Sequence, residues 1–164
     1  ATSTLQIDIG GSLRNAVNDG TVLLGVGALE SISGSGTIQV RETAAVGNGV
    51  DQTLDLGPGN ATVTFLAETA RVSGSTPPIE HFAQGDTLVV ANTVADAVQY
   101  APTGVAGGTL SLSNDGTTVA SLRLLGSYAA NSFMLDDATG QAMITTSTPC
   151  FAAGTLIQTQ RGAV

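Results

Sequence analysis

The sequence predicts an all-β protein whose strands stack as a parallel β-solenoid and which ends in antiparallel hairpins. Three observations lead to this prediction. Apolar residues mostly alternate with polar ones along short segments, which is typical of strands with one buried face. Glycine-rich breaks separate these segments at intervals typical of all-β domains. Aromatic residues make up only 4% of the 164 residues and tryptophan is absent, so small and branched aliphatic side chains must form the core.

The N-terminal half predicts a series of short strands. Their alternating apolar positions are Leu5, Ile7 and Ile9; Ile38 and Val40; Leu54 and Leu56; and Val63 and Phe65, followed by a strand near Leu88 to Ala91. Residues 20–31 are more continuously apolar, which suits a strand that is buried on both faces or lies close to a turn. The segment "GSLRNAVNDG" predicts one short helix, near Ser12 to Val17.

The connections between these strands distinguish a solenoid from a sandwich. In "SGSGTIQV" and "GPGNATVTFL", small residues lead directly into a strand, as they do in the coils of a parallel β-helix. The spacing is irregular and no exact repeat is present, so a β-sandwich is the alternative.

The C-terminal half predicts two hairpins. In the first, Asn114-Asp115-Gly116 separates an alternating strand from a second strand that reaches Leu124. An Asp-Gly pair in this position favours a primed turn, because both of its central residues have positive φ. In the second, Phe133 and Leu135 alternate, the chain turns over residues 136–140, and a strand returns from Met143 to Thr146.

This half resembles a segment of large secreted proteobacterial proteins. The similarity covers Phe82 to Thr146 and follows the order "GGTLSL", "LRLLGSY", "SFMLDD" and "GQAMIT". In those proteins the segment recurs within adhesin-like β-solenoid regions. The resemblance implies an extracellular β-rich module and no particular activity.

Charge is sparse and acidic. The sequence contains thirteen Asp and Glu residues and five basic residues, all of them Arg, so the net charge is −8. Such a surface repels phosphate groups, so we expect no nucleic-acid partner and no attraction to anionic membranes. No apolar run is long enough for a membrane span, so membrane insertion is not expected. Calcium takes oxygen ligands, so an acidic chain could bind it. The tandem Gly-Gly-x-Gly-x-Asp repeats that would indicate calcium binding are absent, and we expect no cofactor.

The sequence offers two weak catalytic candidates in this module. Glu80 and His81 could act as an acid–base pair. No nucleophile lies nearby in the sequence, however, so we expect a surface loop after Pro77-Pro78 instead. Asp136 and Asp137 could be paired carboxylates for glycoside cleavage. Adjacent strand residues point to opposite faces, however, so we expect these two to be turn residues instead.

The C-terminal segment "CFAAGTLIQTQRG" resembles the first block of a Hint domain, the self-processing module shared by hedgehog C-terminal regions and inteins. The matching residues are Cys150, Phe151, Gly154-Thr155 and Gly162, with Pro149 before the cysteine as in bacterial members. The resemblance implies two domains. Residues 1–149 would be a β-rich extracellular module and residues 150–164 the start of a Hint domain.

In that family the leading thiolate attacks the preceding carbonyl carbon and converts the amide into a thioester. The resemblance therefore implies that Cys150 is the self-cleavage nucleophile, that Pro149 is the acyl side of the scissile bond, and that Thr155 is a residue of the Hint block. A thiol of ordinary pKa needs help to ionise, which the family supplies from a downstream Thr-x-x-His block. The given sequence ends before such a block, so we expect the fragment alone to be inert. Without the resemblance, Cys150 would be a small buried hydrophobe.

Together these features predict a non-enzymatic structural or adhesive module, secreted or on the cell surface. We expect it to self-associate or to bind a surface or matrix component, and to be released or ligated through the downstream Hint domain. The alternative is a β-helix that binds or degrades carbohydrate. One cysteine cannot form an internal disulfide and no usual secretory signal is present, so we expect a removed leader or another export route.

Overall fold

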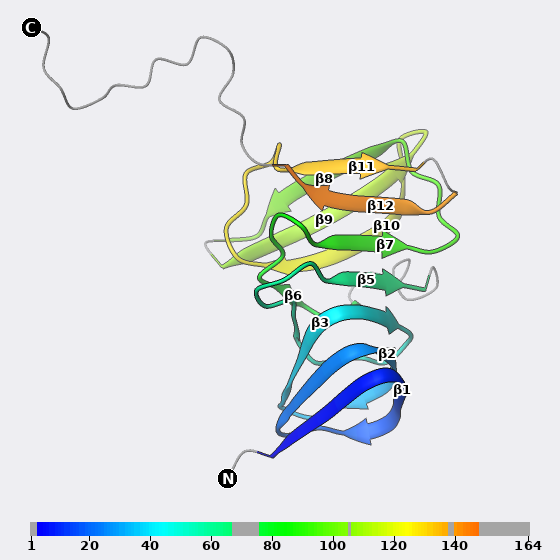
Figure 1. Cartoon of the computed structure of the whole chain (residues 1–164). Coiled ribbons are helices and arrows are strands. Elements are labelled where there is room, and N and C mark those ends of the chain that lie inside the picture. The colour runs from blue at the N-terminus through cyan, green and yellow to red at the C-terminus, as the bar shows by residue number, and fades with distance from the viewer. Residues whose placement is uncertain (1–2, 67–75, 105, 138–139, 148–164) are drawn as a thin grey trace, which may run out of the picture.

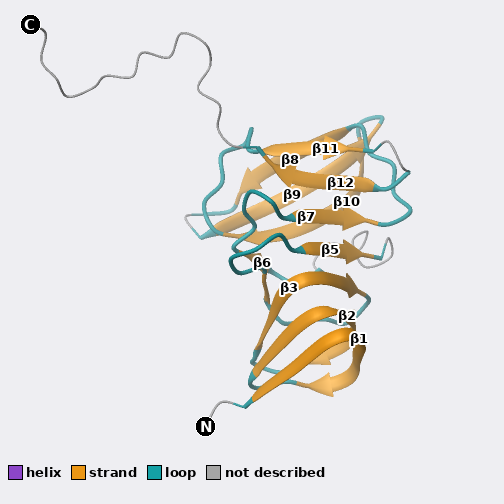
Figure 2. Ribbon diagram, in the orientation of Figure 1, coloured by secondary structure: helices purple, strands orange, loops and turns teal. Residues whose placement is uncertain are grey.

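The computed structural model describes residues 3–66, 76–104, 106–137 and 140–147. The regular elements in these ranges are all strands (Figure 2), which confirms the all-β prediction. No helix within them has the length and apolar character that crossing a membrane requires. The parallel part contains β1 (Thr4–Val17), β2 (Thr21–Ser33), β3 (Thr37–Val46), β4 (Leu54–Asp55), β5 (Thr62–Phe65), β6 (Ile79–Glu80) and β7 (Thr87–Val90). The C-terminal part contains β8 (Ala97–Pro102), β9 (Gly107–Asn114), β10 (Thr117–Leu125), β11 (Phe133–Asp136) and β12 (Ala142–Thr146).

Successive coils of the N-terminal part stack in parallel. β1 pairs with β2 and β2 with β3, so Thr4, Thr21 and Thr37 occupy equivalent positions. β3 pairs with β4 along its first half and with β5 along its second half, and these two ladders continue into β6 and β7. The result is a solenoid of about four turns (Figure 1). The parallel ladders confirm the predicted solenoid and exclude the sandwich, whose sheets are antiparallel.

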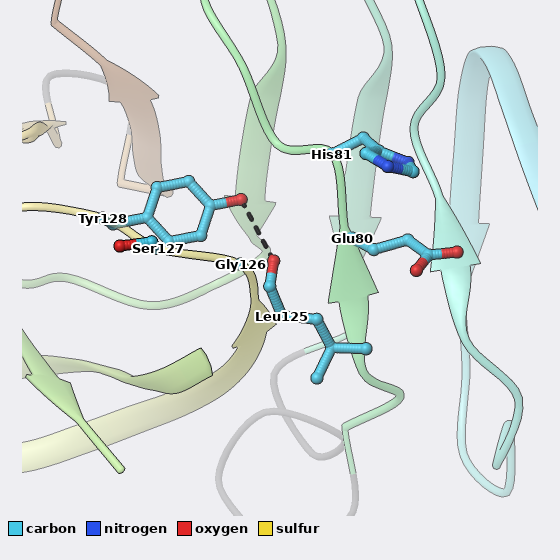
Figure 3. A pocket seen from close by; sticks show the side chains of 6 residues that line it. All are labelled: Glu80, His81, Leu125, Gly126, Ser127 and Tyr128. Carbon is cyan, nitrogen blue, oxygen red and sulfur yellow. Dashed lines mark hydrogen bonds between the residues drawn. The ribbon is translucent and has the colours of Figure 1, made fainter. Parts of the chain in front are cut away.

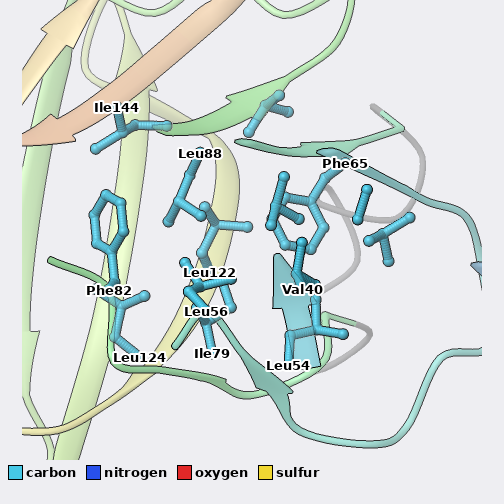
Figure 4. Close-up of a cluster of buried hydrophobic side chains, with 14 of the residues drawn as sticks. Val40, Leu54, Leu56, Phe65, Ile79, Phe82, Leu88, Leu122, Leu124 and Ile144 are labelled. Atoms are coloured by element: carbon cyan, nitrogen blue, oxygen red, sulfur yellow. The ribbon is translucent and has the colours of Figure 1, made fainter. Parts of the chain in front are cut away.

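The core consists of apolar columns that run along the solenoid. Residues at equivalent positions of successive coils stack on one another, and each is at most 1% exposed. One column contains Val22, Ile38, Leu54, Ile79 and Leu124, and another contains Leu29, Val46, Phe65, Val90 and Ala142. Figure 4 shows Leu54, Ile79 and Leu124 of the first column and Phe65 of the second. Each side chain is covered by the coils above and below, which is why small aliphatic residues suffice for the core.

The predicted helix near Ser12 to Val17 is wrong, because these residues form the second half of β1. Asn15 has a left-handed backbone (φ 50°), as does Ser31 (φ 55°) at the equivalent position of the next coil. This corner resets the alternation of the strand. Leu13 and Ala16, three residues apart, therefore both pack against the core. Apolar residues at a spacing of three also occur in helices, so the corner gave the sequence a helical pattern.

The two predicted hairpins are confirmed and cover the C-terminal end of the solenoid. Asp115 (φ 51°) and Gly116 (φ 75°) form the turn between β9 and β10, and β11 pairs with β12 in antiparallel fashion. β10 lies beside β6 and β12 beside β7, so the hairpins cover both arms of the last coil. The opposite end is β1, which pairs only with β2 among the described strands. The two ends lie at opposite poles of the molecule (Figure 1).

Candidate functional site

The candidate site residues of the Hint resemblance lie outside the part of the chain that the structure describes. Cys150, Pro149 and Thr155 lie outside the described residues, which stop at Ser147. The self-cleavage site therefore stays a prediction from sequence.

The structure instead assembles a polar group on the outside of the solenoid, from Asp55, Glu80 and His81. Leu54 and Ile79 point into the core, so the next residue of each strand faces outward. These next residues, Asp55 of β4 and Glu80 of β6, are direct partners in the ladder. One ligand-type atom of each of the three residues lies within 4.8 Å of the others. We call these three residues the Asp55 cluster.

An ion pair organises the Asp55 cluster. His81 Nδ1 lies 2.7 Å from Asp55 Oδ1, which also accepts a hydrogen bond from the Gly57 amide at 2.9 Å. Gln39 Nε2 donates to the other carboxylate oxygen at 3.5 Å. The hydrogen bond that His81 makes to the Asp55 carboxylate raises the pKa of His81. Burial would raise the pKa of Asp55, but the hydrogen bonds from His81 and Gly57 outweigh it and hold that pKa below its ordinary value.

Two surface hollows flank His81. One, of about 280 Å³, is lined by Glu80, His81 and residues 125–128 (Figure 3). The other, of about 460 Å³, is lined by Gln39, Asp55, Gly57, Pro58 and residues 81–83. The imidazole is two-thirds exposed and the Asp55 carboxylate mostly buried, so a ligand in either hollow would meet the ring first.

The aromatic side chains lie next to this site but mostly pack on one another. Phe82, Tyr100, Tyr128 and Phe133 form a cluster with ring centroids 5.3–6.3 Å apart. Phe82, Tyr100 and Phe133 are buried. Tyr128 lines the hollow beside Glu80, whereas Phe82 lines the other hollow but is only 3% exposed. Burial raises the pKa of Tyr128, whose hydroxyl donates to the Leu125 carbonyl at 3.4 Å (Figure 3). The site therefore offers one aromatic ring for stacking on a sugar.

The Asp55 cluster has the groups for proton transfer but lacks a neighbouring nucleophile in the described residues. An Asp–His pair can orient a base for an attacking hydroxyl, as in hydrolase triads. Ser127 lines the hollow beside His81, but Figure 3 shows its hydroxyl pointing away from the imidazole. The mixed oxygen and nitrogen ligands could in principle hold a divalent cation. Asp55, however, already accepts hydrogen bonds from three neighbours.

The sequence identified part of this site. The sequence pairs Glu80 with His81 and predicts a loop, whereas the structure places Glu80 in strand β6. Asp55 was missed as their partner. The sequence contains a pattern that indicates this pairing: "TLDLG" and "PIEHF" both place an acidic residue directly after an inward aliphatic residue. Asp136 ends β11, and among the described residues neither it nor Asp137 joins a group of three metal-ligating side chains.

Comparison with known proteins assigns no family to this fold and site. No family model matches the chain. Neither the curated proteins nor the solved structures that were compared with it gave a significant match. The resemblances to adhesin-like solenoids and to the Hint domain thus rest on the residues quoted above.

Proposed function

We propose that this chain is a non-enzymatic structural or adhesive module, extracellular or on a cell surface, that assembles through the open end of its solenoid. The observation that carries the proposal is the uncovered edge of β1, which pairs only with β2 among the described strands. Three large apolar side chains of this strand are exposed: Leu5 by 49%, Ile9 by 90% and Val17 by 73%.

An open coil is unfavourable when it stays exposed. Its outer edge presents unpaired backbone N–H and C=O groups, which template pairing with another chain. Solenoids that remain monomeric cap both ends with polar residues. Here the hairpins cover one end, whereas Leu5 and Ile9 lie uncovered at the other. Lysine, a common edge-blocking residue, is absent from the sequence. This asymmetry supports a role in assembly.

The Hint resemblance supplies the second part of the proposal. In the longer parent, the Cys150 thiolate would attack the Pro149 carbonyl carbon, the peptide C–N bond would break, and the nitrogen would leave as the amine of Cys150. Water, a thiol or an amine would then release the module from the thioester or ligate it. Mass spectrometry of the parent should show a product ending at Pro149. Recovery of the intact parent alone would contradict this part.

Assembly is tested separately, by sedimentation velocity of this chain from micromolar to near-millimolar concentration. We expect the weight-average sedimentation coefficient to rise with concentration. A strictly monomeric chain over the whole range would contradict the assembling function.

One observation favours the second candidate, a carbohydrate-binding or carbohydrate-degrading β-helix. Asp55 and Glu80 converge between two hollows, one of which includes Tyr128. Two carboxyl groups on either side of a sugar are the arrangement that glycosidases use. Oligosaccharide binding or reducing-sugar release that is lost in Glu80→Gln would favour this candidate. Glu30→Gln, at an exposed position on β2, is the matched control.

A further inference from the structure

We infer that a groove on the outside of the solenoid binds a neutral, linear oligosaccharide, with one sugar ring on each coil and without cleaving it. The inference rests on the carbohydrate-binding candidate above. It adds the extent of the site, the direction of the sugar chain and the class of sugar. Such a ligand would be the surface or matrix component to which an adhesive module binds.

The groove consists of three hollows that follow one another along the solenoid. The first, of about 380 Å³, is lined by residues 39–41 of β3 and residues 56–58 after β4. The second and third are the hollows of about 460 Å³ and 280 Å³ that flank His81. The first and second share Gln39 and Pro58, and the second and third share His81. These shared residues make one continuous groove, which follows the neighbouring strands β3, β4, β6 and β10.

The spacing of the coils suits an extended sugar chain. Neighbouring strands are about 4.8 Å apart, so each hollow lies about one such step from the next. A β-1,4-linked chain of hexoses is nearly straight and advances by a similar length with each ring. Laid along the solenoid axis, such a chain therefore places one ring in each hollow. Stacked repeats form the extended surfaces that other solenoid proteins use for binding.

The side chains along the groove match the groups of a sugar, whose hydroxyls both donate and accept hydrogen bonds. Arg41 and His81 supply donors, and Asp55 and Glu80 supply acceptors. The left-handed backbone of His81 (φ 60°) turns its ring to the same side as the Glu80 side chain, so both can reach one ligand (Figure 3). Tyr128, in the third hollow, offers an aromatic face for stacking on a ring.

The charges favour a neutral ligand. Two basic side chains, Arg41 and His81, and two acidic ones, Asp55 and Glu80, line the groove, so their charges balance when the imidazole is protonated. The whole chain carries a net charge of −8, which repels an acidic glycan. The exposed Arg41 guanidinium has no hydrogen-bond or ion-pair partner within the described part of the chain, so it is free to donate to sugar hydroxyls.

The two carboxylates are placed for binding and not for cleavage. Glycosidases hold the scissile bond between two carboxyl groups, one of which protonates the leaving oxygen. Asp55 and Glu80 instead project from one face of one sheet, as ladder partners, so both meet the ligand from the same side. Burial would raise the pKa of Asp55, but the hydrogen bonds from His81 and Gly57 hold that pKa below its ordinary value. Asp55 therefore stays ionised at neutral pH and cannot be the proton donor.

NMR titration of the full 164-residue chain tests the groove, using β-1,4-linked oligosaccharides of glucose, mannose and N-acetylglucosamine with one to five rings. For at least one of these sugars, the affinity should rise by about threefold or more with each ring up to three and then stay level. The amide signals that shift should belong to residues 39–41, 55–58, 80–83 and 125–128.

Variants at the two ends of the groove test whether each hollow holds a ring. Arg41→Gln in the first hollow should lower the affinity for three rings to about that for two. Glu80→Gln in the third hollow should do the same from the other end. Arg123→Gln, which removes an exposed charge on β10 outside the groove, is the matched control and should leave every affinity unchanged. Thermal unfolding of each variant shows that a lost affinity is not a lost fold.

The outcomes separate this inference from the functions proposed above. Affinity that stops rising at one ring, or that neither Arg41→Gln nor Glu80→Gln lowers, overturns the three-ring groove and leaves carbohydrate binding standing. Tighter binding of oligogalacturonides overturns the neutral ligand, and release of shorter sugars overturns binding without cleavage. If no sugar binds, both this inference and the carbohydrate candidate are wrong, whereas assembly is decided by sedimentation alone.

Discussion

Gln52 should be one of the most important polar residues for the stability of the solenoid. It is 3% exposed, and its side chain bonds to the turns of the preceding coils. Its Nε2 donates to the carbonyl oxygens of Asn18 and Ser33, the latter at 2.9 Å, and its Oε1 accepts from Asn18 Nδ2 at 2.8 Å. Gln52→Ala removes these three bonds. At about 1 kcal/mol net for each, we expect the free energy of unfolding to fall by about 3 kcal/mol.

Urea unfolding followed by circular dichroism measures this loss by linear extrapolation. Gln52→Leu should cost a similar amount, because its apolar side chain also leaves the groups of Asn18 and Ser33 without partners. Gln99→Ala, at an exposed position of β8, is the matched control and should stay within about 0.5 kcal/mol of the wild type. A loss below about 1 kcal/mol for Gln52→Ala would refute the claim that these bonds hold the turns together.

Two further predictions concern carboxylates. Asp86 is buried and accepts hydrogen bonds from the Ala61 and Ala83 amides, so Asp86→Ala should cost about 2 kcal/mol or more in urea unfolding, and Asp86→Asn less. Burial raises the pKa of Asp86 in the folded state above its unfolded value. The free energy of unfolding should therefore rise as pH falls from the folded-state pKa to the unfolded-state pKa. The same pH dependence in Asp86→Asn would contradict this. For the Asp55 cluster, NMR titration should give His81 a pKa above 6.5 that falls in Asp55→Asn, and an unchanged value would contradict the ion pair. This pair stabilises the fold below the unfolded pKa of His81 and loses that effect as pH rises through the folded one.

Local patterns were enough to predict most of the fold. The alternation at Leu54 and Leu56, and at Val63 and Phe65, correctly gave inward residues. The Asp115-Gly116 turn was predicted because its left-handed geometry restricts which residues can occupy it. The corner at Asn15 was misread, because one left-handed residue changes the apolar spacing from two to three. Strand periodicity alone could not distinguish that corner from a helical turn.

The candidate site was harder to predict because it depends on which coils stack. Asp55 and Glu80 are ladder partners although 25 positions separate them, a longer interval than between Ile38 and Leu54. The strands that carry them contain only two residues each, which gives no periodicity to align. The uncovered edge of β1 could not be predicted from the sequence either, because an end strand has the same alternating pattern as an inner strand.

The equivalence of Thr4, Thr21 and Thr37 has a consequence for how such a rod changes in evolution. Loss of residues 21–36 as a unit would put Thr37 where Thr21 stands, with Ile38 in the place of Val22 and Val40 in that of Leu24. The gain or loss of one whole coil therefore changes the length of the solenoid by about 4.8 Å, the spacing of neighbouring strands, and leaves the surfaces of both ends unchanged.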